Sequence, residues 1–203
     1  MADTSFGVTA GSGTNLHTVS TSIGGTTVQD QVVKLGPPYL ATYTVGVPGI
    51  SVATADAHLM QLMAGATLPV YVTRIRLYQV VAATTATLGR IDIHRVTTAG
   101  TGGGPQTEAA HDEADAASGA VATTLPTAKG TEGARLYAAT VGYMQTMPTA
   151  GFDALLLDID FPHEMGKPLR ISAGTSSGLV VKGVTAVAAA TVAVNITYFE
   201  ASF

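Results

Sequence analysis

Ala154-Leu155-Leu156-Leu157-Asp158-Ile159-Asp160-Phe161 is the first of four strand-like runs that decide the fold of this chain. The other three cover residues 167–172, 177–182 and 191–199, and glycine or proline separates them. Runs rich in β-branched and aromatic residues at this spacing, with no helical pattern between them, are typical of antiparallel sandwiches and barrels. The sequence therefore predicts an all-β protein, an antiparallel jelly-roll-like β-sandwich.

The clearest alternation of apolar and polar residues lies upstream, over residues 70–80 and 90–96. Side chains two apart on a strand share a face. In the second run the alternation predicts that Ile91 and Ile93 point into the core. In the first run it predicts one inward face made of Tyr71, Thr73, Ile75 and Leu77.

The remaining elements are less regular. We expect Gly46-Val47-Pro48-Gly49 to form a turn after a strand over 39–45. Residues 58–65 fit either a strand or one helical face, and the stop at Gly65 favours a strand. Residues 106–118 are expected to contain one helical turn. Further strands bring the expected total to about ten, enough for two packed sheets; they cover 28–35, 120–124 and 134–143.

The composition points to a subunit of an assembly. Charged residues make up 12% of the 203 residues, about half of the usual ~25%. Lys and Glu are depleted where subunits cover one another. The net charge of −4 and the scattered basic residues argue against nucleic acid as a partner. The chain has no Cys, so disulfides and Cys-ligated metals are excluded.

The domain organisation follows from the glycine, serine and threonine content near the start. Residues 1–35 are expected to form an extended N-terminal arm and the first strand, because residues 1–26 carry too few large apolar side chains to order alone. Residues 36–203 are expected to form the sandwich, with a long irregular loop near 97–133 as a contact for a partner. Neither a signal peptide nor a membrane span is expected.

The densest group of ionisable residues lies in that loop. Carboxylates on a loop can hold Ca²⁺, but the alternating acids and central glycine of a calcium loop are missing. A solvated polar loop is the favoured interpretation. The group comprises Glu108, His111, Asp112, Glu113 and Asp115.

Two strands carry further candidates. Asp158 and Asp160 share a face and could serve acid–base or glycosidic chemistry, but the chain has no Trp that could form a sugar platform. His94 lies on one face with Asp92 and Arg90 and could ligate a metal, although no second His accompanies it. We therefore assign no catalytic, cofactor-binding or metal residue, and we expect a protein that is not an enzyme.

Two segments resemble parts of known virion proteins. Gly24-Gly25-Thr26-Thr27-Val28-Gln29-Asp30-Gln31-Val32-Val33-Lys34-Leu35 resembles a segment near the start of tailed-bacteriophage virion proteins. Residues 90–103, Arg90 to Gly103, resemble a strand and loop of small β-rich phage structural proteins. The resemblance implies a capsid decoration (cement) protein with a jelly-roll-like sandwich and cyclic oligomers, located in the virion after assembly in the host cytoplasm.

The resemblance implies as partners further copies of the chain, with a trimer favoured, and the major capsid protein or other virion subunits. Two alternatives stay open. A tail or fibre module would recognise a host surface through residues 97–133. A carbohydrate-active or metal-dependent sandwich enzyme would bring Asp158, Asp160 or the region of His111 together in a pocket.

Overall fold

The computed structural model describes residues 18–23, 26–31, 40–147 and 153–201. The chain divides into two compact units, Met1–Tyr39 and Leu40–Phe203. In the first unit, β1 (Thr18–Ile23) and β2 (Thr26–Gln31) form an antiparallel hairpin in which Ile23 pairs with Thr26. The sequence prediction missed β1, because this hairpin has little apolar content to reveal it. The expected continuation of the first strand over 32–35 lies outside the described residues.

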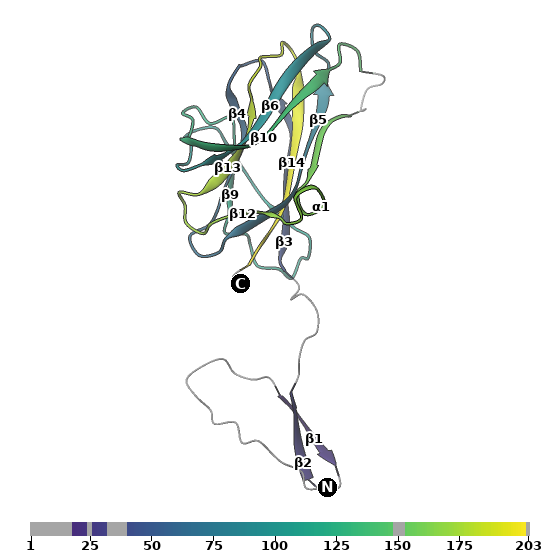
Figure 1. The fold of residues 1–203 in the computed structure, drawn as a ribbon, viewed down its shortest axis with the longest axis vertical. Helices are drawn as coiled ribbons and strands as arrows, with labels where there is room; N and C mark the ends of the chain where they lie inside the picture. The colour runs from purple at the N-terminus through teal and green to yellow at the C-terminus, as the bar shows by residue number, and fades with distance from the viewer. Residues whose placement is uncertain (1–17, 24–25, 32–39, 148–152, 202–203) are drawn as a thin grey trace. The chain divides into compact units, whose positions relative to one another are not determined.

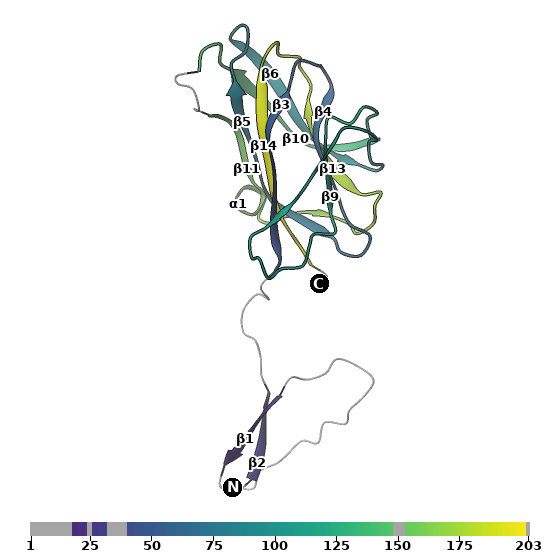
Figure 2. The same cartoon turned by 180° about the vertical axis from the view of Figure 1, so that it is seen from behind.

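The second unit is a sandwich of two antiparallel sheets (Figures 1 and 2). The first sheet has the order β10-β6-β13-β4-β9-β7, and the second has the order β11-β5-β14-β3-β8, with β12 also paired to β5. This confirms the all-β sandwich, while the jelly-roll connection stays a prediction. The strands of the first sheet are β4 (Ala57–Met63), β6 (Thr87–Val96), β7 (Gly104–Gln106), β9 (Val121–Thr124), β10 (Glu132–Tyr143) and β13 (Gly178–Gly183). Those of the second are β3 (Thr42–Ser51), β5 (Val70–Val81), β8 (Ala109–Ala110), β11 (Ala154–Asp160), β12 (Leu169–Ile171) and β14 (Thr191–Glu200).

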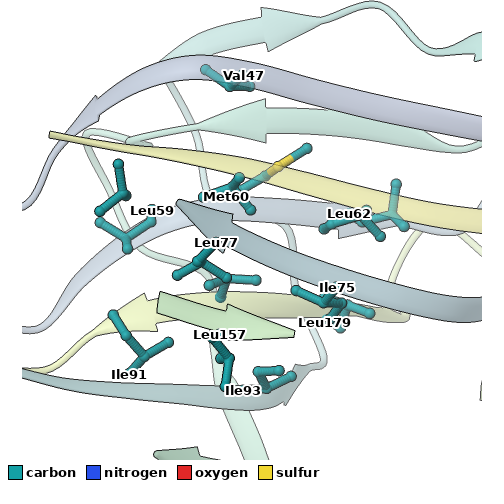
Figure 3. Packing of buried hydrophobic residues seen from close by; sticks show 14 of the residues in the cluster. Val47, Leu59, Met60, Leu62, Ile75, Leu77, Ile91, Ile93, Leu157 and Leu179 are labelled. Carbon is teal, nitrogen blue, oxygen red and sulfur yellow. The ribbon is translucent and has the colours of Figure 1, made fainter. Parts of the chain in front are cut away.

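The core lies between the two sheets, where apolar side chains from both inner faces meet (Figure 3). Ile75 and Leu77 come from the second sheet, and Ile91, Ile93 and Leu179 come from the first; all five are fully or almost fully buried. Burial of such side chains contributes about 1.5–3 kcal/mol each. The prediction that Ile91 and Ile93 point inward is confirmed.

Two irregular pairings explain where the strand predictions failed. The expected turn at 46–49 is wrong, because β3 continues through Pro48 to Ser51. The pairing of β3 with β14 shifts register between Val192 and Val194, opposite Pro48. A bulge at this point accommodates a residue that has no N–H to donate to the ladder.

The pairing of β14 with β5 contains a second register shift, between Thr197 and Tyr198. As a result, even-numbered residues face the core at the start of β5, and odd-numbered residues face it further along the strand. Val70 and Val72 are buried in place of Tyr71 and Thr73, which are only half-buried, so the single inward face predicted for this strand is wrong at its start. Tyr71 instead lies on the outer surface and stacks on Phe199, with ring centroids 4.9 Å apart.

The long connection between β6 and β10 is largely folded. In residues 106–118 the expected helical turn is wrong, since the structure has β8 and a turn closed by the Asp115 N–H donating to the Asp112 carbonyl. The strand favoured for residues 58–65, by contrast, is confirmed as β4, which ends at Met63. Because β13 and β4 separate β6 from β9 in the sheet, the chain must cross those two strands on its way to β9 and again on its way back.

The crossing takes place on the outer face of the first sheet. The Gly100 N–H donates to Gln61 Oε1 at 3.0 Å, and Gln61 is paired with Val180, outside the main core. Gly100 belongs to the outgoing part of the connection, and Thr101 pairs with Ala128 of the returning part. We call the two crossing stretches, residues 97–103 and 125–131, the covering segment, because they lie over a face of the first sheet that the alternation alone would leave to solvent.

A five-residue helix, α1 (Phe161–Met165), follows β11 and was not expected from the sequence. Asp160 caps its first turn by accepting the His163 N–H, and Gly166 ends it in the left-handed conformation with φ of 71°. These are ordinary start and stop signals. Within the described residues, no helix is long and apolar enough to cross a membrane.

Candidate functional site

The largest group of interacting ionisable side chains lies on the outer face of the first sheet, beside the covering segment. Strand register assembles it: Lys182 of β13 pairs with His58 of β4 on one side and with Asp92 of β6 on the other. Glu132, the first residue of β10, completes the group from the end of the covering segment. His58 is 2% exposed and Asp92 is 3% exposed. We call this group the buried charge network.

Glu132 is the centre of one half of the network. Its Oε1 lies 2.9 Å from His58 Nε2 and 3.0 Å from Lys182 Nζ. His94 Nδ1 lies 3.6 Å from its other oxygen. Lys182 also reaches Asp56 at 3.2 Å, so the network links β4, β6, β10 and β13.

Asp92 is the centre of the other half. Arg90 donates to both carboxylate oxygens of Asp92 from Nε and Nη2, each at 2.8 Å. Arg135 and His94 lie at 3.6 and 3.5 Å from Asp92 Oδ2. Bidentate pairs of this kind are the stronger ion pairs.

Burial and the neighbouring charges shift the pKa values of the network in opposite directions. Burial raises the pKa of Asp92, but the hydrogen bonds and charge of Arg90 outweigh it and leave the pKa below its usual value. The pKa of Glu132 is likewise lowered, because His58 and Lys182 outweigh its burial. At His58 burial dominates over Glu132, so the pKa of the imidazole is lowered.

The arrangement fits a structural clamp better than a reactive site. Glu132 and Asp92 are each engaged by at least two basic groups, and His94, singled out from the sequence, lies between these two acids. In the part of the chain that the structure describes, no three His, Asp or Glu side chains are grouped so that they could hold a metal ion. The sequence pattern correctly predicted that Arg90, Asp92 and His94 share a face. It did not predict that His58 and Lys182 join them, because their proximity depends on strand order.

We expect the free energy of unfolding to fall as the pH is lowered from about 7 to about 5, because of His58. Its pKa in the folded protein lies below the ordinary value, so the unfolded chain binds more protons in the interval below about 6.5. One such group gives a slope of at most about 1.4 kcal/mol per pH unit. The groups that face it are Glu132, Lys129 and Lys182.

Chemical denaturation across this pH range, compared between the wild type and His58→Gln, measures the contribution. Glutamine can keep the hydrogen bond to Glu132 but cannot take up a proton. His163→Gln, an exposed imidazole outside the network, is the matched control. Equal slopes for the wild type and His58→Gln would contradict the prediction.

The paired aspartates of β11 have separate structural roles. Asp158 accepts from Arg74 Nε at 2.7 Å and lies 3.6 Å from Arg76 Nε. The hydrogen bond from Arg74 lowers the pKa of Asp158. Asp160 caps α1. The two carboxylates do not converge on a pocket, whereas the neighbouring Ile159 and Phe161 are buried.

The acidic loop group is spread out rather than gathered. Asp112 accepts the Ala114 N–H, and His111 Nε2 lies 2.7 Å from Thr44 Oγ1. Glu108 is a separate case: it accepts the Ala122 N–H at 3.2 Å, and burial raises the pKa of its carboxyl. These side chains hold the connection between β6 and β10 in place.

Glu200, which the sequence did not single out, fastens the same connection to the second sheet. Its carboxylate accepts from Ser118 Oγ at 2.8 Å and from the N–H groups of Gly119 at 3.1 Å and Ala120 at 2.9 Å. Glu200 is 8% exposed. The sequence offers one signal for this anchor: Glu200 is a charged residue at the end of the otherwise mainly apolar strand β14.

Comparison with known proteins gives no relative: no family model, no curated protein and no solved structure matches the chain. The fold and the network define it as a β-sandwich with a buried charge network on the outer face of one sheet, together with a separate N-terminal hairpin unit.

Proposed function

We propose that this chain is a non-enzymatic structural subunit of a tailed-phage virion, a decoration protein that binds the capsid exterior as a trimer. The N-terminal unit carries the proposal. Its two described strands have six residues each and form a two-stranded sheet of their own. A two-stranded hairpin is at best marginally stable in water. It therefore fits an attachment arm that gains stability from a neighbouring subunit or from the capsid.

The edge strand β10 supports contact between subunits. It has 12 residues and is the terminal strand in the order of the first sheet. Its exposed residues are mostly small, among them Ala134, Ala138 and Thr140. A long edge whose exposed side chains are mostly small can accept a further strand. Closure of this edge by a second copy would also protect it from aggregation.

The distribution of charge agrees with such a role. Only 12% of the residues are charged, and Asp92, Glu132 and Asp158 are engaged in internal ion pairs. These pairs reduce further the number of ionic groups that keep a single subunit dispersed. This favours an exterior that other subunits cover.

Deleting residues 1–39 should convert a trimer into a monomer. The sandwich has a core of its own within Leu40–Phe203, so the truncated chain should fold, whereas the full chain should sediment at three times its mass of 20.5 kDa. Sedimentation velocity of both forms measures this, with circular dichroism to verify that the strands persist. A full-length chain that stays monomeric at millimolar concentration would contradict the assembly.

The virion location has a separate test. Antibodies raised against the folded chain should label the heads of phage particles from cells that express it. Labelling confined to tails would favour a host-recognition module instead. Purified particles that lack the chain would refute the virion assignment altogether.

A further inference from the structure

A pocket of about 320 Å³ opens at the end of the sandwich where β6, β12 and α1 meet. The floor is apolar and includes Phe161, Met165 and Leu169. Met165 is 49% exposed, although it is a large apolar side chain. The volume lies at the lower end of the range for ligand sites and is enough for one large side chain.

Three basic residues surround this floor: Arg95, Lys167 and Arg170. Hydrogen bonds hold two of them in place. Arg95 Nη1 donates to the Arg170 carbonyl at 3.0 Å, and Arg170 Nε donates to Tyr71 Oη at 3.3 Å. The cations are thus positioned beside an apolar surface by contacts with the protein itself.

These cations stand apart from the other basic residues of the chain. Among the residues that the structure describes, none of the three is in ion-pair contact with a carboxylate, and Lys129, the other described cation of this kind, donates to the Asp56 carbonyl. The remaining described Lys and Arg residues all form ion pairs with carboxylates; they are Arg74, Arg76, Arg90, Arg135 and Lys182. Three of the four described cations that form no ion pair thus line one pocket, where their charge would attract an anion.

The chemistry of the lining selects the kind of anion. Arg and Lys only donate hydrogen bonds, so they suit a carboxylate better than sugar hydroxyls, which also need acceptors. Phe161 is 1% exposed, and Tyr71 already stacks on Phe199. The aromatic rings thus give little open surface for a nucleobase or a sugar ring.

We propose that this pocket binds an acidic peptide segment of a partner protein, with an apolar side chain on Met165 and Leu169 and flanking carboxylates on Lys167, Arg170 and Arg95. Charge complementarity and the apolar floor select this occupant together. The site does not depend on the virion assignment, because it would recognise such a peptide wherever the protein is located.

The test follows the methionine methyl groups of the full chain by NMR, with the blocked peptide acetyl-Asp-Phe-Asp-amide as the probe. The Met165 signal should shift and saturate, while those of Met60 and Met63, both buried, should stay fixed. Acetyl-Asn-Phe-Asn-amide should bind about tenfold more weakly or not at all, since the charge is lost. Acetyl-Asp-Gly-Asp-amide should be similarly weak, since it lacks the apolar side chain.

Variants separate the pocket from a general charge effect. The double variant Lys167→Glu and Arg170→Glu should lose the Met165 shift while the Met60 and Met63 signals report an intact fold. Lys129→Glu makes the same kind of charge change elsewhere and should keep it. An unshifted Met165 signal in the wild type, equal binding of the aspartate and asparagine peptides, or tighter binding of glucuronate or a nucleoside monophosphate would each overturn the proposal.

Discussion

Replacing Val180 by aspartate should cost at least about 4 kcal/mol of unfolding free energy, enough to unfold many domains of this size. Val180 has no exposed surface and packs with Met63 and Val96 on the outer face of the first sheet. A carboxylate there would be desolvated. The nearest basic group along the strand, Lys182, is already held by Glu132.

This result distinguishes the folded covering segment from an open loop. If the covering segment lay away from the sheet, position 180 would face water and would tolerate a charge. Val121→Asp on β9 is the matched control, because Val121 is 55% exposed; it should change stability by less than about 0.5 kcal/mol. Thermal or urea unfolding of the two variants measures the difference, and equal stabilities would contradict the covering of this face.

Val180 also illustrates what the sequence could and could not predict. Alternation along residues 90–96 identified Ile91 and Ile93 as core, because each strand's period of two is a local property. It could not reveal that the opposite face is buried as well. That burial depends on a strand order in which β13 and β4 lie between β6 and β9. Strand order cannot be predicted from the pattern of any single run of residues.

The irregularities of the strands also depend on pairing between segments that are far apart in the sequence. The bulge that moves Tyr71 to the outer face arises from the pairing of β5 with β14, residues more than a hundred positions apart. The missed helix α1 is different, since Asp160, Pro162 and Gly166 are start and stop signals in the sequence itself. The candidate network was half predicted for the same reason: Arg90 and Asp92 are two apart on one strand, whereas His58 and Lys182 join them through tertiary pairing.

Replacing Glu200 by alanine should cost about 3 kcal/mol of unfolding free energy and should loosen the connection near residue 120. The substitution removes an acceptor shared by three donors, those of Ser118, Gly119 and Ala120. Two of them keep a second partner, because Ser118 Oγ lies 2.8 Å from Tyr198 Oη and the Ala120 N–H also donates to Ser118 Oγ at 3.1 Å. A buried donor left unpaired costs about 1–3 kcal/mol. The exposed Gly119 can turn to water, and the buried Ala120 keeps only its longer bond to Ser118, so the total cost should stay below the sum for three unpaired donors.

The conservative variant Glu200→Gln keeps a carbonyl oxygen as acceptor and loses the charge, so its cost should be smaller, about 1–2 kcal/mol. Glu113→Ala, in an exposed position of the same connection, is the control and should be close to neutral. Hydrogen exchange gives the local readout: the Ala120 amide should exchange much faster in Glu200→Ala than in the wild type. Because this carboxylate links the second sheet to the connection that leads into β9, an unchanged exchange rate at Ala120 would mean that this connection is held by other contacts.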